Sequence, residues 1–421
     1  MKEKDFLEEL IEKELAEEGT EPAAEKPKAK KKKAAEPEEA PEQDTNNEHA
    51  LNSLLEKIET LQQQGAEIWK TGFPALDELI GGGFMEDQLI FLGALSALGK
   101  TTFALQLATQ VAENGRDVYI FSLEMRRDEL NAKIISMYTE KLSSEREKEY
   151  RVTTRDILLG NVDYTGFEAR AKGALTAKGK LFKKALEHAQ EIANKINIYV
   201  GSGDVSVDRI REVTERHIKR TGHKPLLIVD YLQIMKPSEK AIFSDKRLLT
   251  DYDVTSLKCI ARDFRIPVLA ISAFNRSNYL EPVSMGSFRE SSGIEYSSDI
   301  LLALQYSGMD YTKKRFKGDT GRSMIHYESE KDHKSRIRLL LERIDKKRKD
   351  GQGGIDVELK ILKCRLAPPD TISFDFFPAY NCYHSLDKYR PHDDSYFAYS
   401  DVDNSDTGAN GTRVAAGEKM I

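Results

Sequence analysis

The chain has 421 residues, of which 64 are basic and 70 are acidic, and its formal net charge is −6 at pH 7. This balance carries little information on nucleic-acid binding, because a protein can confine positive charge to a few loops. The three cysteines, Cys259, Cys364 and Cys382, form no CxxC pair, which argues against a disulfide framework and against a zinc site. Neither a secretory leader nor a run of eighteen apolar residues is visible, so we expect neither secretion nor a membrane span.

The two ends of the chain differ in composition from its middle. Residues 1–47 contain a lysine run at 28–33, acidic clusters, Ala and Pro, and we expect a disordered charged tail because such a segment buries little apolar surface. Within it, residues 1–18 have apolar side chains at helical spacing, typical of either a docking helix or a weakly helical tail. Residues 379–421 are polar and predicted to be mostly disordered, which leaves 67–378 as one folded domain.

The segment 48–66 is predicted to be an amphipathic linker helix that ends at Gly65. Its apolar stripe consists of Leu51, Leu54, Leu55, Ile58 and Leu61. Such a stripe must be buried, either on the chain's own domain or on a neighbouring subunit.

From Thr71 onward, apolar runs alternate with helical stretches such as residues 101–113. Strands are predicted at residues 87–93, 117–123, 197–200, 226–231, 268–272, 300–306, 336–344 and 355–362. Alternating β and α elements predict an α/β fold, a mostly parallel sheet with helices on both faces. Charged insertions interrupt the pattern at about 140–190 and about 308–335.

A phosphate-binding loop is predicted at residues 94–101 (ALSALGKT), between an apolar strand and a helix. Lys100 is expected to reach the β- and γ-phosphates of ATP, and Thr101 to bring its hydroxyl to Mg²⁺. Ala94 occupies the first position, where glycine is usual, and Gly93 stands one residue too early to fill it. The predicted nucleotide contacts are Ser96, Leu98, Gly99, Lys100, Thr101 and Thr102.

Two carboxylates follow buried strands and complete the predicted ATP site. Asp230 ends the apolar run 226–230, where a Walker-B aspartate would hold Mg²⁺ through water. Glu124 ends the first strand after the loop and is the candidate for orienting or deprotonating the attacking water. The alternative for Glu124 is an ordinary carboxylate at a helix N-terminus.

The order of these motifs resembles the RecA-like motor domain of DnaB-type replicative helicases, over roughly residues 68–365. The matching stretches are 71–77 (TGFPALD), the loop at 94–101, 121–125 (FSLEM), 229–235 (VDYLQIM), 288–295 (FRESSGIE) and 346–348 (KKR). The resemblance implies a P-loop ATPase core, ATP and Mg²⁺ as cofactors, and a homohexameric ring on single-stranded DNA in a bacterial or phage-infected cytoplasm. Primase and a helicase loader are the further partners that it implies.

The resemblance also implies roles for individual residues. Glu124 matches the catalytic glutamate, and Asp230 the Walker-B aspartate. Lys346 and Arg348 match a cationic pair that reaches the γ-phosphate of the neighbouring subunit, and a planar guanidinium suits that charge. The residues that match the DNA-contacting loop of the central channel are Arg289, Glu290 and Ser292.

Several positions depart from the family pattern. The SQLNR motif of the family reads SAFNR at 272–276, so Ala273 replaces a polar residue expected to sense the γ-phosphate. No segment before residue 65 resembles the globular collar domain of the family. The alternatives are therefore another RecA-like DNA-dependent ATPase of recombination or repair, or a non-catalytic subunit that uses ATP as a switch.

Overall fold

The computed structural model describes residues 47–95, 97–162, 175–201, 205–238, 245–275, 279–288, 291–317, 323–350 and 353–386. They fall into two units, the first ending at Gly65 and the second beginning at Ala66. Most of the two predicted tails lies outside the described residues. Among the residues described, no helix combines the length and apolar character needed to cross a membrane.

The described part of the first unit is the helix α2 (Asn47–Gln64), followed by Gly65 in a left-handed conformation (φ 78°). A helix is therefore present where the sequence predicts one, at 48–66. Its apolar stripe is 39–58 % exposed in Leu51, Leu54, Leu55, Ile58 and Leu61.

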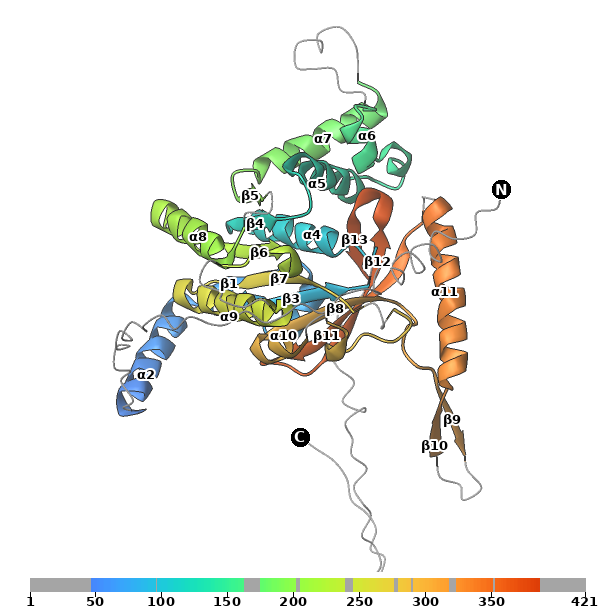
Figure 1. The fold of residues 1–421 in the computed structure, drawn as a ribbon. Coiled ribbons are helices and arrows are strands. Elements are labelled where there is room, and N and C mark those ends of the chain that lie inside the picture. The colour runs from blue at the N-terminus through green and yellow to red at the C-terminus, as the bar shows by residue number, and fades with distance from the viewer. Residues whose placement is uncertain are drawn as a thin grey trace, which may run out of the picture. The chain divides into compact units, whose positions relative to one another are not determined.

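The second unit is built on a nine-stranded sheet with the order β13-β12-β11-β8-β3-β7-β6-β4-β5 (Figure 1). The strands from β8 to β5 in that order are parallel, and β11, β12 and β13 add antiparallel to β8 at one edge. The bounds are β3 Leu89–Ala94, β4 Val118–Ser122, β5 Ile196–Val200, β6 Leu226–Asp230, β7 Val268–Ala273, β8 Ile300–Tyr306, β11 Ile355–Cys364, β12 Asp370–Phe377 and β13 Cys382–Ser385.

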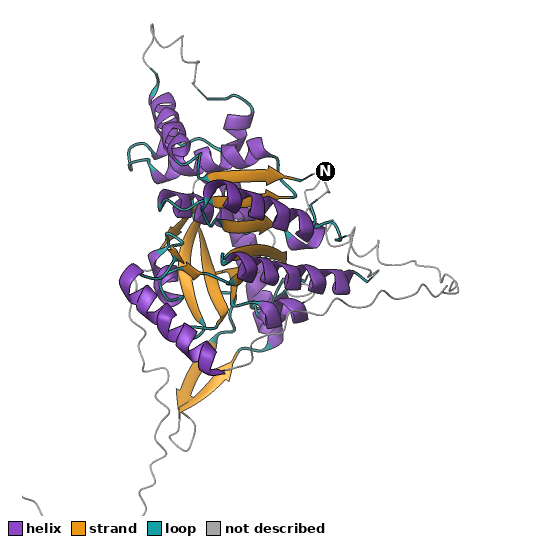
Figure 2. Cartoon of the chain, turned by 90° about the vertical axis from the view of Figure 1, so that its left-hand side faces the viewer, coloured by secondary structure: helices purple, strands orange, loops and turns teal. Residues whose placement is uncertain are grey.

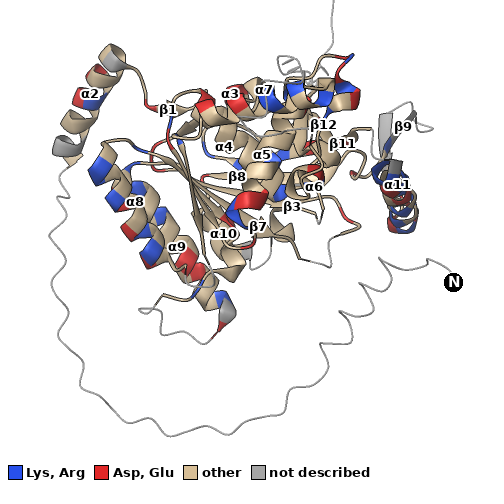
Figure 3. Cartoon of the chain, turned by 90° about the horizontal axis from the view of Figure 1, so that it is seen from above, with Lys and Arg blue, Asp and Glu red and all other residues tan. Residues whose placement is uncertain are grey.

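Helices cover both faces of this sheet. The helix α4 contacts β3, β4, β5 and β6, whereas α9 contacts β3 and β7. Figure 3 shows α4 and α5 on one side of the strands and α8 and α9 on the other. The helix bounds are α3 Pro74–Leu79, α4 Lys100–Glu113, α5 Arg127–Lys141, α6 Thr154–Leu158, α7 Ala177–Glu191, α8 Val207–Thr221, α9 Lys246–Phe264, α10 Ser291–Ser297 and α11 Glu330–Asp350.

The remaining elements are two short antiparallel strand pairs and several 3₁₀ turns. Figure 2 shows the small hairpin of β9 and β10 extending beyond the main sheet. The bounds are β1 Ile68–Trp69, β2 Phe84–Met85, β9 Lys313–Lys317, β10 Ser323–Tyr327, and the 3₁₀ turns η1 Lys148–Tyr150, η3 Leu232–Ile234, η5 Met285–Ser287 and η6 Pro378–Tyr380.

The central strands and the helix α4 are buried, which accounts for their apolar sequences. All residues of β3, β6 and β8 are buried, as expected of parallel strands covered on both faces. The helix α4 is buried from Thr102 to Ala112, since the sheet lies on one side of it and α5 and β13 contact it elsewhere. This packing anchors the loop before α4.

Two sequence-based predictions were wrong. Residues 336–344, predicted to form a strand, lie within α11, where His333, Ile337 and Ile344 are buried at helical spacing. The folded domain does not end at 378, because β13 pairs with β12 and its Tyr383 is 2 % exposed. The insertion at about 308–335 forms the β9–β10 hairpin and the start of α11.

Candidate ATP site and its link to the DNA loop

The predicted phosphate-binding loop connects β3 to α4 at the carboxyl edge of the parallel strands. Gly99 precedes the helix in a left-handed conformation (φ 71°), and Ala97 also has a positive φ of 61°. The side chain of Leu98 is fully buried, so a ligand can meet only the backbone of this residue. Ser96 lies outside the described residues. The loop is therefore placed as the sequence predicts, with its backbone at the start of a helix.

Lys100, Thr101 and Asp230 come together at this edge. The ammonium of Lys100 lies 3.5 Å from the carbonyl oxygen of Ala94. Burial lowers the pKa of Lys100, and the neighbouring Asp230 and Glu124 oppose that shift. Asp230 is 3 % exposed and accepts a hydrogen bond from Thr101. Burial raises the pKa of Asp230 to about 6, although the Thr101 hydrogen bond lowers it.

The oxygens of Asp230 and Thr101 fit a bound Mg²⁺. The Oδ2 atom of Asp230 is buried and has no hydrogen-bond partner among the described residues, which is a costly arrangement for a carboxylate oxygen. A hard cation such as Mg²⁺ takes oxygen ligands and keeps several waters. When bound, it would neutralise the charge of the nucleotide phosphates beside Lys100.

Glu124 stands beside these residues because the ends of two strands are joined. Ser122 of β4 pairs with Asp230 of β6, and the amide of Leu123 donates to the Asp230 carbonyl oxygen at 2.8 Å. Glu124 follows directly and is exposed. A carboxylate held next to the phosphate-binding loop and open to solvent is placed to orient a water molecule.

A cationic side chain that no sequence motif signalled also lies at this site. Lys133, on α5, has its ammonium 3.3 Å from the Thr102 hydroxyl and 2.7 Å from Oδ1 of Asn381. Burial lowers the pKa of Lys133, and nearby Asp230 opposes that shift. Asn381 belongs to the segment predicted to be a disordered tail. The pair was missed because neither residue occurs in a recognisable pattern.

The ATP site is linked by hydrogen bonds to the end of the neighbouring strand β7. The amide nitrogen of the Gln233 side chain donates to the Ser272 hydroxyl at 2.8 Å, and its oxygen accepts from the backbone of Ala273 at 3.2 Å. Beyond Ala273, the side chain of Asn275 donates to the carbonyl oxygen of Phe288 at 3.2 Å. The route therefore runs from the Walker-B strand to the residue that precedes the predicted DNA loop.

Gly93 has no side chain, and this leaves room beside the route for the rings of Phe274 and Phe288. A Cβ atom at Gly93 would lie 2.1 Å from the ring of Phe274 and 2.6 Å from that of Phe288. These two rings pack edge to face, with centroids 4.9 Å apart. The glycine that seemed displaced from the loop motif thus serves the packing between β3 and the connection to Phe288.

The predicted DNA-contacting residues are only partly described. Arg289 and Glu290, and Arg276 of the SAFNR motif, lie outside the described residues. Ser292 is near the start of α10, and its hydroxyl accepts a hydrogen bond from Arg247 of α9 at 2.7 Å.

Comparison with known proteins identifies the family. The model of the DnaB-like helicase C-terminal domain matches residues 69–385, three quarters of the chain. The chain belongs to the DnaB-like helicase family. The match includes β13, which agrees with the longer domain described above.

Curated relatives are similar but longer. The chain is 28 % identical over 262 residues to the replicative DNA helicase DnaB of Pasteurella multocida, covering 60 % of this chain and 50 % of the relative. It is 25 % identical over 354 residues to the replicative DNA helicase DnaC of Bacillus subtilis, covering 82 % of this chain and 62 % of the relative. The chain thus spans about half to three fifths of these relatives.

Solved structures share the fold. One of them, an isolated ATPase domain, aligns with a TM-score of 0.57 and 22 % identity, covering 82 % of this chain and all of that chain. A DnaB-like replicative helicase studied for its interactions with primase aligns with the same TM-score and identity, covering 81 % of this chain and 69 % of that chain. The predicted RecA-like α/β class is confirmed.

The cationic pair assigned from the DnaB resemblance, Lys346 and Arg348, lies near the end of α11. Lys346 is exposed at that end. Arg348 donates from Nη2 to the carbonyl oxygen of Ala97, at 2.9 Å, in the phosphate-binding loop of its own chain. The role of this pair at a neighbouring subunit stays a prediction.

A second Lys-x-Arg sequence lies at the opposite edge of the sheet in this DnaB-like fold. Lys363 and Arg365 stand at the end of β11, where Cys364 pairs with Ile300 at the start of β8. The Nε atom of Arg365 lies 3.1 Å from Asp299, whose carboxylate also accepts from the amide of Leu89 at the start of β3. The P-loop is at the other end of β3, roughly 16 Å away at ~3.3 Å per residue.

Proposed function

We propose that this chain is the ATP-hydrolysing motor of a ring-shaped replicative DNA helicase, which moves along single-stranded DNA in the 5′ to 3′ direction and unwinds duplex DNA. The observation that carries the proposal is a pair of links between the ATP site and the predicted DNA loop. Gln233, three residues after Asp230, bonds to Ser272 and Ala273 at the end of β7, and Asn275, two residues further along, bonds to Phe288 beside that loop. A motor needs such a link, because phosphate chemistry must change the position of a DNA contact.

Within one subunit, the described side chains divide the work of hydrolysis. Lys100 and the loop backbone bind the phosphates of ATP, and Thr101 and Asp230 hold Mg²⁺, the latter through water. Glu124 orients the attacking water and accepts its proton. Lys133 adds positive charge next to Asp230, which favours the ionised carboxylate that the metal requires.

Lys346 and Arg348 are the proposed pair that completes the ATP site of the neighbouring subunit. Both lie near the end of α11, where Lys346 is exposed. In a ring each interface joins two different faces of the same chain, so each ATP site can combine the P-loop of one subunit with cations of the next. The planar guanidinium of Arg348 suits the charge that develops on the phosphoryl oxygens.

The DNA contact is proposed for Arg289, Glu290 and Ser292, which follow or lie next to Phe288. Contacts to the phosphate backbone predict binding without sequence preference and with strong dependence on salt. The exposed stripe of α2 is proposed to pack on a neighbouring subunit of a homohexamer. Primase and a helicase loader are the proposed partners, in the cytoplasm of a bacterial or phage-infected cell.

Strand displacement tests the proposal directly. In the presence of ATP and Mg²⁺, a duplex that carries only a 5′ single-stranded tail should be unwound. A duplex that carries only a 3′ tail should stay intact. Filaments on DNA without strand displacement would favour a recombination or repair ATPase. ATP binding without hydrolysis or displacement would favour the non-catalytic subunit. Ala273 motivates this alternative, because it replaces a polar residue expected to sense the γ-phosphate.

A further inference from the structure

The outer face of α11 carries a cationic row, formed by Lys331, Arg338 and Lys349. All three side chains are exposed, and none of them forms an ion pair with another residue that the structure describes. Their spacings are close to two and three helical turns, so they lie along one line of the helix surface, about 27 Å long at 1.5 Å per residue. Figures 1 and 3 show α11 standing apart from the helices that cover the sheet.

The inner face of α11 is fixed to the rest of its unit. Ile337 and Ile344 are buried on this face. Arg336 donates to the carbonyl oxygen of Asp310 at 2.7 Å and pairs with Glu328 at 2.6 Å. Because the inner face is held in this way, the helix presents the cationic row on a fixed support.

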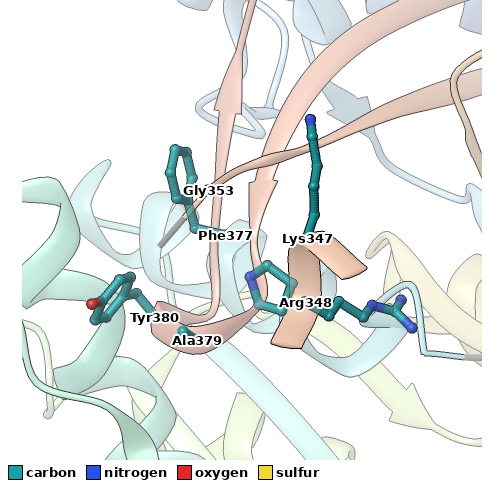
Figure 4. Close-up of a pocket in the computed structure, with 7 residues that line it drawn as sticks. Lys347, Arg348, Gly353, Phe377, Ala379 and Tyr380 are labelled. Atoms are coloured by element: carbon teal, nitrogen blue, oxygen red, sulfur yellow. The ribbon is translucent and has the colours of Figure 1, made fainter. Parts of the chain in front are cut away.

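Other cations of α11 have acidic neighbours within the chain. Figure 4 shows Lys347 and Arg348 leaving the end of the helix in different directions, beside a pocket that Tyr380 also lines. Lys347 lies 3.6 Å from Asp356, and Arg348 lies 3.8 Å from Asp345. The lack of an acidic partner is therefore a property of the cationic row and not of the whole helix.

The charged helix α8 shows how exposed cations are paired elsewhere on this chain. Its Arg211 pairs with Asp263 at 2.6 Å, and its Lys219 pairs with Glu215 at 2.5 Å. On α11 the row stays unpaired although acidic groups outnumber basic groups in the chain, whose formal net charge is −6. A line of unneutralised positive charge attracts a partner with a line of negative charge.

An exposed aromatic ring adjoins the cationic row. The hairpin pairs Lys313 of β9 with Tyr327 of β10, and the Lys313 ammonium lies 5.7 Å from the centre of the Tyr327 ring. Tyr327 is 53 % exposed and comes four residues before Lys331. Cations beside an exposed ring suit single-stranded nucleic acid, because the cations contact phosphates while the ring stacks on a base.

We propose that the cationic row, with Lys313 and Tyr327, binds single-stranded DNA, and that this DNA is the strand which the motor displaces. The surface contains none of the residues of the predicted DNA loop, so it is a second DNA contact. The inference rests on the proposed function, because a ring that moves along one strand leaves the other strand outside.

Two DNA substrates separate this surface from the predicted DNA loop. One is a duplex with only a 5′ tail, and the other is a fork that also carries a single-stranded 3′ arm. In fluorescence anisotropy with a non-hydrolysable ATP analogue, the wild type should bind the fork more tightly. The triple variant Lys313→Ala, Lys331→Ala, Arg338→Ala should bind the fork about 10-fold or more less tightly at low salt, and the tailed duplex as the wild type does.

The dependence on salt reports the number of phosphate contacts. Each contact to a single strand contributes about 0.7 to the slope of log K against log salt, so the triple variant should lose about 2 from the slope for the fork. Arg216→Ala, Lys219→Ala, Arg220→Ala removes three exposed cations from α8 and is the matched control. Basal ATP hydrolysis should be unchanged in both variants.

A gain of binding tests the same surface without removing a cation. Glu342 is exposed and lies eleven residues after Lys331, on the line of the cationic row. Glu342→Lys should tighten binding of the fork and add about 0.7 to the slope. Tyr327→Ala should weaken binding of the fork, whereas Tyr327→Phe, which keeps the stacking ring, should not.

Three outcomes would overturn the proposal. They are an unchanged affinity of the triple variant for the fork, an equal loss in the α8 control, and an equal loss on the tailed duplex, which would place the row on the strand that the loop holds. If the wild type displaces no strand, the proposed motor function fails, while a loss confined to the fork still supports a second strand on α11.

Discussion

The side chain of Asn275 donates a hydrogen bond to the carbonyl oxygen of Phe288 at 3.2 Å. The backbone adds to this link, since the amide of Asn275 donates to the Ser287 carbonyl oxygen at 2.8 Å. Asn275 lies two residues after Ala273, whose own amide bonds to Gln233. The SAFNR motif thus lies between the ATP site and the residue that precedes Arg289.

Removing this link should uncouple hydrolysis from DNA. We expect Asn275→Ala to keep most of the basal ATPase rate and to lose most of its stimulation by single-stranded DNA, because the backbone bond to Ser287 remains but the side-chain bond to Phe288 does not. The measurement is turnover with and without DNA. Asn114→Ala, at the far end of α4, is the control. Full stimulation in Asn275→Ala would show that the route lies elsewhere.

Asp230→Asn should stabilise the nucleotide-free protein while abolishing hydrolysis. Burial raises the pKa of Asp230 to about 6, above its ordinary value of about 4, so the ionised carboxylate destabilises the fold. This penalty is fully present above pH 6 and absent below pH 4. The substitution should therefore raise the free energy of unfolding by ~2–3 kcal/mol at pH 7.5, and by little below about pH 4, where the carboxyl group is protonated. Chemical unfolding at pH 7.5 and below pH 4 checks this, and an equal gain under the two conditions would contradict it.

Arg348→Ala should lower kcat by about 10³-fold or more and leave ATP affinity nearly unchanged, because Arg348 completes a neighbour's site. Chains carrying Arg348→Ala, mixed with Lys100→Ala chains, should regain activity, because some interfaces then combine an intact P-loop with an intact Arg348. Arg338→Ala, an exposed arginine of α11, is the matched control. Wild-type turnover in Arg348→Ala, or no recovery in the mixture, would remove Arg348 from this role.

The linker helix should govern assembly. Leu54→Asp combined with Leu55→Asp places two charges in the exposed stripe of α2, where both residues are more than half exposed. We expect a smaller mass in light scattering and an unchanged circular dichroism spectrum, since the ATPase unit does not depend on this stripe for its core. Lys57→Asp on the same helix is the control. An unchanged mass would count against a role of α2 in the ring.

The central sheet could be predicted from sequence because its strands are short apolar runs. The run at 226–230 and the loop at 94–101 have strong local signals, and both occur where they were expected. The parallel order followed from alternation with helices.

Of the elements after β8, the strand β11 was expected at 355–362, but α11 and β13 could not be predicted in the same way. Residues 336–344 contain apolar side chains whose spacing fits either a strand or a helix. The segment is too short for its length to decide between the two, although it belongs to the long helix α11. The strand β13 is only four residues long, and its Tyr383 is buried through tertiary contacts with α4, the loop and Phe376 of β12. Lys133 and Asn381 meet across 248 positions of sequence, which no local pattern signals.

Stimulation of ATP hydrolysis by single-stranded DNA is the decisive measurement for a DNA-coupled motor. Turnover should be measured at micromolar protein with and without DNA, beside a Glu124→Gln variant that keeps nucleotide binding. We expect strong stimulation in the wild type and its loss in Glu124→Gln. Hydrolysis that is insensitive to DNA, or equal rates in the two proteins, would contradict a DNA-coupled motor with Glu124 at its catalytic centre.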